Sequence, residues 1–382
     1  MFKSVKDKES FTLLSLTLAG KIGVGSISGI ALAIKIGGIG TIFWLWVSSI
    51  FLIPIAYFET KLGLKYKKEI DKTYIGGPQV YIEQKLNKKK LAIIYSLLII
   101  LIYIVSFISI QTNTIITSFS YYFNNKVFLM IILVLITYFS INKGINSITK
   151  ITNFLVPIMS ILYMIIGVII IIKNNNLIYL IKVIIQEAFN IKNIKQSLIL
   201  PIVIGFERAI FSNETAIGTT TMLASISNDN NLERQSSIQI ISILFTNLII
   251  CTITAFIILS TTNSIFPTSN GIEMIYYSIN KQLGNVGTII LTMIIFLFAF
   301  STIITSYYYG EINIKYLINK NSTIAKIIVI IVVIFSSFID GKIIWKYIDL
   351  IIAIATLINI YAIKKVNVYD RKWLGWIIER RV

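Results

Sequence analysis

The stretch Gly23-Val24-Gly25-Ser26-Ile27-Ser28-Gly29 decides how this chain is read, because it puts three glycines and two serines inside a hydrophobic segment long enough to cross a bilayer. Glycine lowers the cost of unwinding a helix, and unwound backbone at membrane depth is tolerated only where protein or a watery cavity surrounds it. Interrupted helices of this kind form the ion and substrate sites of secondary transporters. Gly25-x-x-x-Gly29 by itself is also typical of a helix-packing face.

The composition indicates a membrane protein, since 56% of the 382 residues are hydrophobic and only 14% are charged. Apolar runs bounded by charges and turn residues predict ten membrane spans in a single transporter domain over 1–382. The spans are at about 11–35, 39–64, 91–122, 127–142, 151–173, 197–225, 235–262, 284–309, 322–339 and 343–363, of which the fourth and ninth are short. Shorter interfacial helices are expected between Leu177 and Lys195 and after Gly271.

The net charge of +18 invites comparison with nucleic-acid binders, but its distribution favours a membrane explanation. With the N-terminus in the cytoplasm, most Lys and Arg residues fall on the inner side, most densely between Lys61 and Lys90, as the positive-inside rule requires. We therefore expect a multi-pass protein of the cell (plasma) membrane with both termini in the cytoplasm and no nucleic-acid partner. The basic tail over 364–382 is expected to rest on anionic headgroups of the lipid bilayer.

Missing residue types limit the chemistry that is open to the chain. It has no histidine, and its single cysteine, Cys251, lies inside a predicted span. Disulfides, Cys/His metal sites and a Ser-His-Asp hydrolase are therefore excluded. No nucleophile and base stand together in the sequence, so we predict that the protein is not an enzyme and has no cofactor apart from a coupling ion.

The predicted spans divide into two halves of five, at about 11–173 and 197–363, and an odd number per half gives the second half the opposite orientation. Each half opens with a span interrupted by polar residues. In the sixth span these are Gly205-Phe206-Glu207-Arg208, Ser212-Asn213-Glu214 and Gly218. Corresponding broken segments in two inverted halves are the sequence pointer to a transporter site. We predict an all-α polytopic membrane protein with broken first and sixth helices.

Five ordered blocks of the sequence resemble one family. They are Ile22 to Trp46 (IGVGSISGIALAIKIGGIGTIFWLW); Glu59 with Gly76-Gly77-Pro78 and Tyr81; Gln111-Thr112-Asn113; Arg208 to Gly218 (RAIFSNETAIG); and Ala299 to Glu311 (AFSTIITSYYYGE). The chain resembles the alanine or glycine:cation symporters, which are sodium-coupled amino-acid carriers. The resemblance implies a LeuT-like fold of ten helices in a 5+5 inverted repeat, with alternating access around a site between the first and sixth helices.

The resemblance also implies which residues meet a small neutral amino acid. The substrate residues are Gly25, Ser26, Gly29, Gln111, Asn113, Gly205, Phe211 and Ser212. The carboxylate would meet the backbone amides and the hydroxyl of the first helix, and half-helix N-termini favour that anion. The ammonium group would meet carbonyl and side-chain oxygens of the third and sixth spans. Gln111 is as consistent with an interhelical hydrogen bond as with a ligand contact.

The implied sodium ligands are the carbonyls of Gly23 and Ser26 and the hydroxyls of Ser301 and Thr302. Serine and threonine in membrane helices commonly bond to their own helix, so the two hydroxyls alone favour a structural role. The charged residues Lys21, Glu207, Arg208 and Glu214 are predicted to form either a gate or a structural ion-pair network. Charge at membrane depth is costly unless it faces the bundle interior and pairs.

Several positions depart from the family pattern. Where the family has GTGN, this chain has Gly23-Val24-Gly25-Ser26, and Ala209 replaces the glycine that follows the arginine. We predict a cation-coupled (sodium) importer of a small neutral amino acid such as alanine or glycine. One alternative is coupling to protons through Glu207 or Glu214, since without histidine a carboxylate has to carry the proton. The other is a degenerate relative that binds or senses an amino acid without moving it.

Overall fold

The computed structural model describes residues 8–70, 73–190, 199–227, 231–261, 271–318, 323–339 and 341–369. In these ranges the chain is almost entirely helical, as predicted. The exception is an antiparallel hairpin of β1 (Lys68–Ile70) and β2 (Thr73–Ile75), in which Lys68 faces Ile75. Most of the predicted basic tail, from residue 370 on, lies outside the described residues.

The first span is broken where the glycines predict. Helix α1 (Lys8–Lys21) ends just before them, a 3₁₀ turn covers Val24–Ser26, and α2 (Ser28–Gly37) continues at an angle of 63° to α1. Gly23 before the turn is extended, with φ −109° and ψ −166°. The predicted span over 11–35 is therefore two half-helices with irregular backbone between them.

The sixth span is broken as well. Helix α10 (Ile199–Asn213) and α11 (Thr219–Ile226) flank five residues of irregular backbone. Glu214, Ala216 and Gly218 adopt positive φ values of 55°, 72° and 117°. Left-handed backbone is costly for a residue with a Cβ, so it persists at the first two positions only because the surroundings hold it.

The other predicted spans also correspond to helices. Within the described ranges, six helical stretches are long and apolar enough to cross a membrane, or seven when the bent α1–α2 pair is counted as one span. They are α3 (Thr41–Tyr66); α5 (Lys89–Ile100) continuing through a π-helical stretch into α6 (Ile108–Ser120); α8 (Ile145–Asn174); α12 (Leu232–Ile243) continuing likewise into α13 (Cys251–Leu259); α14 (Gly271–Ile318); and α16 (Gly341–Tyr369). Helices α7 (Lys126–Ile141) and α15 (Thr323–Ser336) are the short fourth and ninth spans.

Shorter elements lie between the spans. Helix α9 (Leu177–Ala188) occupies most of the segment predicted as an interfacial helix, and residues 191–198 are outside the described part. The short helix expected after Gly271 is the first part of α14, which bends at Gly284 with φ 65°. Helix α4 (Pro78–Leu86) follows the β1–β2 hairpin in the lysine-rich loop, where the sequence predicts only a loop.

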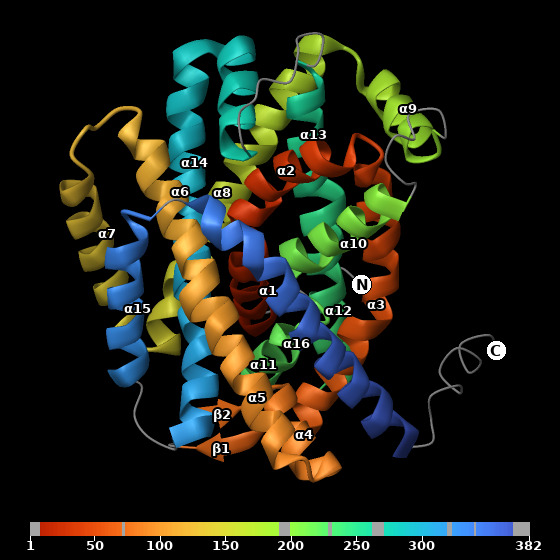
Figure 1. Cartoon of the computed structure of the whole chain (residues 1–382), viewed down its shortest axis with the longest axis vertical. Helices are drawn as coiled ribbons and strands as arrows, with labels where there is room; N and C mark the ends of the chain where they lie inside the picture. Colours follow the sequence, from red (N-terminus) through yellow and green to blue (C-terminus); the bar gives the residue numbers. More distant parts are fainter. Residues whose placement is uncertain are drawn as a thin grey trace.

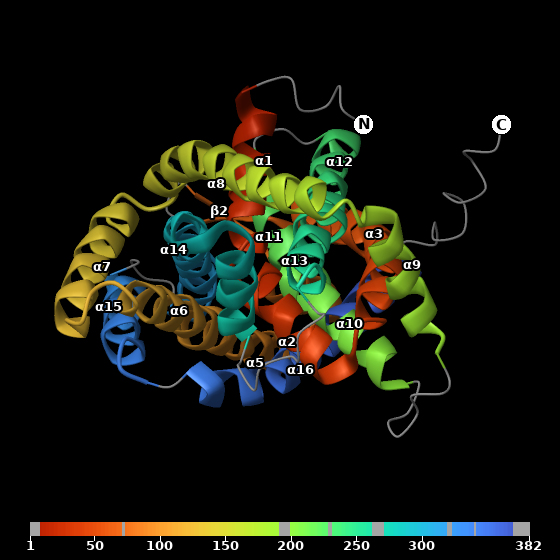
Figure 2. The ribbon, with the colours of Figure 1, turned by 90° about the horizontal axis from the view of Figure 1, so that it is seen from above.

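The two broken spans lie at the centre of the molecule. Helix α1 packs against α8, α12 and α14, and α2 packs against α10, α13 and α14. Figures 1 and 2 show α7 and α15 at the periphery. The residues of the irregular stretches are buried, from Lys21 to Ile27 in the first span and from Phe211 to Gly218 in the sixth. Non-helical backbone at this depth is thus surrounded by protein, as a hydrocarbon environment requires.

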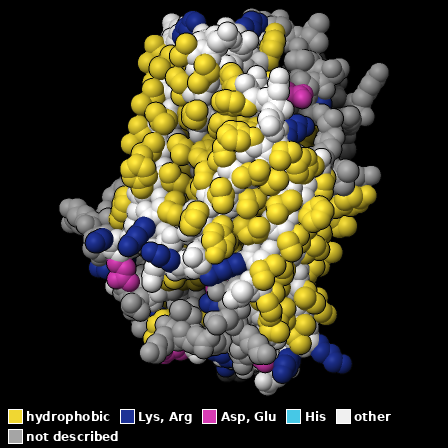
Figure 3. Space-filling model, turned by 90° about the vertical axis from the view of Figure 1, so that its left-hand side faces the viewer, with side chains coloured by type: hydrophobic (Ala, Val, Ile, Leu, Met, Phe, Trp, Pro, Cys, Tyr) yellow, Lys and Arg dark blue, Asp and Glu magenta, His cyan; other side chains and the backbone are white. Residues whose placement is uncertain are grey.

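The outer surface fits a bilayer. Figure 3 shows a face covered by hydrophobic side chains, with Lys and Arg gathered towards its upper and lower ends. Large apolar side chains are exposed on the peripheral helices, for example Phe139 of α7 and Phe335 of α15. An exposed apolar band between two polar ends is what a lipid-facing surface needs, so the chain forms a multi-pass membrane protein.

Candidate functional site

The break in the first span meets the sixth and third spans at one point. A Cβ built on Gly25 would lie 2.6 Å from Cε1 of Phe211 on α10, so the backbone of the break is pressed against that ring. The amide of Val24 donates a hydrogen bond to Oε1 of Gln111 on α6 (3.1 Å). Phe211 also stacks on Phe107 of the third span, with ring centroids 4.9 Å apart. Three of the predicted substrate residues, Gly25, Gln111 and Phe211, are therefore neighbours.

Ser26 and Ser212 are buried close to the seventh span. The carbonyl of Ser26 accepts a hydrogen bond from Thr254 Oγ1 (2.9 Å), and its hydroxyl donates to the Lys21 carbonyl (3.3 Å). The hydroxyl of Ser212 donates to Oδ1 of Asn247 (2.6 Å). Both serines thus stand beside the two breaks, and α12–α13 contributes polar partners that the sequence does not single out.

Two predicted substrate residues lie elsewhere. Nδ2 of Asn113 donates to the carbonyl of Ile339 (2.6 Å), because two helical positions turn it about 200° away from Gln111. Gly205 packs against α3, where an added Cβ would lie 2.6 Å from Cβ of Trp44. Gly29, the second residue of α2, lies next to α16, and a Cβ built on it would meet Trp345 and Arg208.

Three of the four predicted sodium residues, Gly23, Ser301 and Thr302, meet at the C-terminal end of α1. The hydroxyls of Ser301 and Thr302 on α14 both approach the carbonyl of Ala19, at 3.3 Å and 3.0 Å. A Cβ on Gly23 would lie 2.5 Å from Thr302 Oγ1, so Gly23 borders the same place. The carbonyl of Gly23 accepts from the Ser26 amide (3.1 Å).

Sequence reasoning missed Ala19, because a backbone carbonyl has no sequence signature. The last-turn carbonyls of a helix lack partners within the helix, and the glycines after Lys21 indicate where α1 ends.

The four predicted charged residues separate into two groups. On one side of the breaks, the buried ammonium of Lys21 donates to Ser242 Oγ (2.8 Å). Glu214 is fully buried within the sixth-span break, and neither of its carboxylate oxygens accepts a hydrogen bond from the described residues. A Cβ on Gly20 would lie 3.2 Å from Oε2 of Glu214 and 2.8 Å from the hydroxyl of Tyr309, so these two groups converge beside α1.

On the other side of the breaks, Arg208 forms an ion pair with Asp349 of α16. Its guanidinium lies over the rings of Phe211 (5.2 Å) and Trp345 (5.7 Å), and these two rings stack on each other with centroids 5.1 Å apart. Glu207, half-buried, is next to the same pair. Asp349 and Trp345 are functional candidates that the sequence does not indicate, since they are distant in the chain from Arg208.

A buried polar network holds the sixth-span break. Nδ2 of Asn359 on α16 donates to Oε1 of Glu59 on α3 (2.6 Å) and to the carbonyl of Ala216 (2.8 Å). The hydroxyl of Tyr81 donates to Oδ1 of Asn359, and that of Tyr95 donates to the carbonyl of Ile217. Side chains from α16, α4 and α5 therefore fix the irregular backbone in place.

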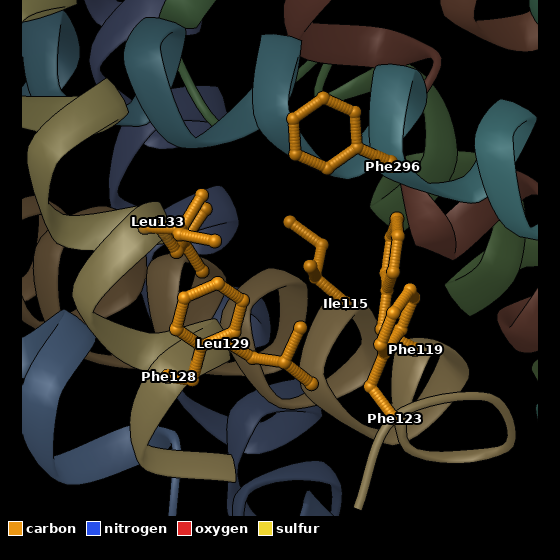
Figure 4. A pocket seen from close by; sticks show the side chains of 8 residues that line it. Ile115, Phe119, Phe123, Phe128, Leu129, Leu133 and Phe296 are labelled. Atoms are coloured by element: carbon orange, nitrogen blue, oxygen red, sulfur yellow. The ribbon is translucent and has the colours of Figure 1, made fainter. Parts of the chain in front are cut away.

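A cavity of about 200 Å³ lies away from the breaks, between α6, α7 and α14 (Figure 4). Its lining is wholly apolar: Ile115, Phe119, Phe123, Phe128, Leu129, Ile132, Leu133 and Phe296. A zwitterionic solute needs partners for two charges, so this cavity does not suit one. The polar groups at the breaks remain the candidate site.

Comparison with known proteins identifies the family of the chain. The family model described as "Sodium:alanine symporter family" matches residues 3–371. The chain is 32% identical over 375 residues to the amino-acid carrier protein AlsT of Bacillus subtilis, covering 95% of this chain and 80% of that protein. It is 28% identical over 383 residues to the sodium/alanine symporter AgcS of Methanococcus maripaludis, covering 96% and 84%.

Solved structures of similar fold are transporters too. A Na⁺-coupled sialic acid symporter in a substrate-bound outward-open state superposes with a TM-score of 0.65 at 15% identity, over 93% of this chain and 79% of that one. A manganese transporter mutant of Eremococcus coleocola gives a TM-score of 0.60 at 11% identity, over 94% and 79%. These likenesses support the LeuT-like fold alone. From the family match, the chain belongs to the sodium:alanine symporter family, whose members are sodium-coupled transporters of amino acids and not enzymes.

Proposed function

We propose that this protein imports a small neutral amino acid, such as alanine or glycine, together with sodium by alternating access. The observation that carries the proposal is the meeting of Gly25, Gln111 and Phe211 at the break between α1 and α2. The close approach of the Phe211 ring to Gly25 leaves little room there, which favours a substrate with a small side chain.

The substrate's two charges find complementary groups at this point. Helix α2 directs its N-terminal amides, at Ser28 and Gly29, towards the break, and that end of a helix favours a carboxylate. The ammonium group would meet carbonyl oxygens of the two irregular stretches together with the Ser212 hydroxyl. In this proposal Gly25, Ser26 and Gly29 hold the carboxylate, and the carbonyl oxygens of the breaks with Ser212 hold the ammonium group.

Sodium is proposed to bind at the C-terminal end of α1. The ion needs hard oxygen ligands, and the Ala19 carbonyl with the Ser301 and Thr302 hydroxyls supplies three from two elements. Gly23 borders the same region, and the carbonyls of Gly23 and Ser26 are proposed as further ligands. The partial negative charge at a helix C-terminus also favours a cation. Bound sodium would tie α1 to α14 and thereby stabilise the state that binds substrate best, which is how an ion gradient drives uptake.

We propose a single transmembrane transporter domain whose halves, at about 11–173 and 197–363, are inverted repeats. It lies in the cell membrane with both termini in the cytoplasm, and its basic tail over 364–382 contacts lipid. The distribution of Lys and Arg along the sequence supports this orientation.

Uptake into proteoliposomes tests the proposal. Radiolabelled alanine or glycine should accumulate when sodium is higher outside, and accumulation should stop when choline replaces sodium or monensin dissipates the gradient. Equal accumulation without sodium would contradict sodium coupling. Exchange of labelled for unlabelled alanine separates a carrier from a sensor, because a protein that binds without transport shows sodium-dependent binding but no exchange.

Proton coupling is a second candidate mechanism, favoured by the state of Glu214. A carboxylate that is fully buried is costly as an anion, so taking up a proton would relieve it. Glu214→Gln should then abolish dependence of uptake on a pH gradient while leaving alanine exchange intact. Unchanged pH-gradient dependence in this variant would remove Glu214 as the proton carrier.

A further inference from the structure

The buried beginning of α2 lacks the cap that helices normally have. Its N-cap residue is Ile27, which has no polar side chain and therefore makes no side-chain capping hydrogen bond. Ile27, Ser28 and Gly29 are all buried. The first N–H groups of a helix have no partner within it, so a buried and uncapped N-terminus calls for an acceptor from outside the helix. An anion satisfies it best, because the helix dipole adds to the hydrogen bonds.

A second unsatisfied donor lies at the same place. Arg208 is only 3% exposed, and while Nη2 bonds the carboxylate of Asp349, Nη1 has no hydrogen-bond partner among the described residues. A buried donor of a charged group left without an acceptor is expensive, and the rings of Phe211 and Trp345 keep water from the guanidinium. One terminal nitrogen of the Arg208 guanidinium, Nη2, therefore has a hydrogen-bond acceptor, and the other, Nη1, has none among the described residues.

The two features are adjacent. A Cβ built on Gly29 would lie 4.0 Å from Nη1 of Arg208 and 3.8 Å from Cη2 of Trp345. The unsatisfied nitrogen is thus beside the first turn of α2. One carboxylate can accept from both, since its two oxygens offer about four acceptor positions.

We propose that Arg208 binds the carboxylate of the transported amino acid, through Nη1 and together with the first-turn amides of α2. This assignment rests on the proposed function. Nη2 stays with Asp349, so the substrate's carboxylate links α2 to α16 through a single guanidinium. The first consequence is that the transporter requires a substrate with a free carboxylate. The second is that the Arg208–Asp349 ion pair, which holds α16 beside the site, is strengthened only when such a substrate is bound.

Binding of a matched pair of ligands tests the role. Thermal unfolding of the purified protein in sodium-containing detergent reports binding, because a ligand that binds the folded state raises the melting temperature. L-Alanine should stabilise the wild type, and L-alaninamide, which differs only in its carboxyl group, should not. Arg208→Gln should weaken L-alanine binding by about 10- to 100-fold, the range for a charge-assisted hydrogen bond, and bring the two ligands close together in affinity.

Asp349→Asn is the matched control. It breaks the ion pair but leaves Nη1 and the α2 amides in place, so discrimination between L-alanine and L-alaninamide should persist. Gly29→Ala is a second test of the same site, which can be used if Arg208→Gln does not fold. The added methyl would meet its neighbours at 3.8–4.0 Å, an ordinary contact, so the protein should fold. The methyl would also fill the space between α2 and Nη1 of Arg208 where the carboxylate is proposed to bind, so L-alanine affinity should fall several-fold.

The outcomes separate the two proposals. If Arg208→Gln folds and still prefers L-alanine over L-alaninamide as strongly as the wild type, the role of Arg208 is wrong and the proposed function stands. Full L-alanine affinity in Gly29→Ala also contradicts it. If neither alanine nor glycine stabilises the wild type in sodium, the proposed function fails and this inference fails with it.

Discussion

Gly25 has no room for a side chain, because the Phe211 ring already occupies the position that a Cβ would take. Gly25→Ala should push the ring aside and lower the affinity for alanine by about tenfold, since overpacking a close contact typically costs about 1–3 kcal/mol. The Michaelis constant for sodium-driven alanine uptake measures the effect. Adding Phe211→Leu should restore part of the affinity, because it removes the clash, and a purely additive loss in the double variant would contradict this explanation.

Thr302 offers a second test at the level of one residue. Its hydroxyl contacts the Ala19 carbonyl at 3.0 Å, and we propose that both oxygens are sodium ligands. Thr302→Val keeps the shape of the side chain and removes its oxygen. The sodium concentration for half-maximal uptake should therefore rise about tenfold or more, because a lost contact to an ion costs about as much as a lost hydrogen bond to a charged group. Thr305→Val is the control, because that hydroxyl bonds only the Ser301 carbonyl one turn away (2.7 Å). Equal effects of the two variants would argue against a site at Thr302.

At the scale of elements, apolar run length predicts the spans well and polar interruptions predict both breaks. The glycines locate the end of α1, and the cluster from Ser212 to Gly218 locates the gap between α10 and α11. The β1–β2 hairpin and α4 were not predicted, since short elements in a charged loop have weak periodicity. Contacts between distant elements were not predicted either: Arg208 with Asp349, and Asn359 with Glu59, are pairs that one sequence does not reveal.

The network around Asn359 gives a prediction at this scale. Asn359→Leu removes the amide that donates hydrogen bonds to Glu59 and to the Ala216 carbonyl. It also removes the oxygen that accepts from Tyr81, so three buried groups lose their partner. Each buried polar group left unsatisfied costs about 1–3 kcal/mol, so the variant should lose about 3 kcal/mol or more of stability and unfold at a clearly lower temperature. Thr356→Val, one turn away on α16, should have little effect, because its buried hydroxyl makes no hydrogen bond with the described residues. Equal melting temperatures for the two variants would show that the network does not hold the break.

For the whole molecule, the proposed orientation in the membrane can be tested by labelling introduced cysteines, because the native chain has only one. Cys251 is the single cysteine in the sequence and is 1% exposed, so the wild type should not react with a membrane-impermeant maleimide. Lys35, at the end of α2, and Lys150, near the start of α8, are both exposed and lie at opposite ends of the bundle in our topology. With the N-terminus in the cytoplasm, Lys35→Cys should label in intact cells and Lys150→Cys should label only after the membrane is permeabilised. Because charge placement sets orientation, the reverse pattern would mean that the lysine-rich loop faces outward and that the positive-inside interpretation is wrong.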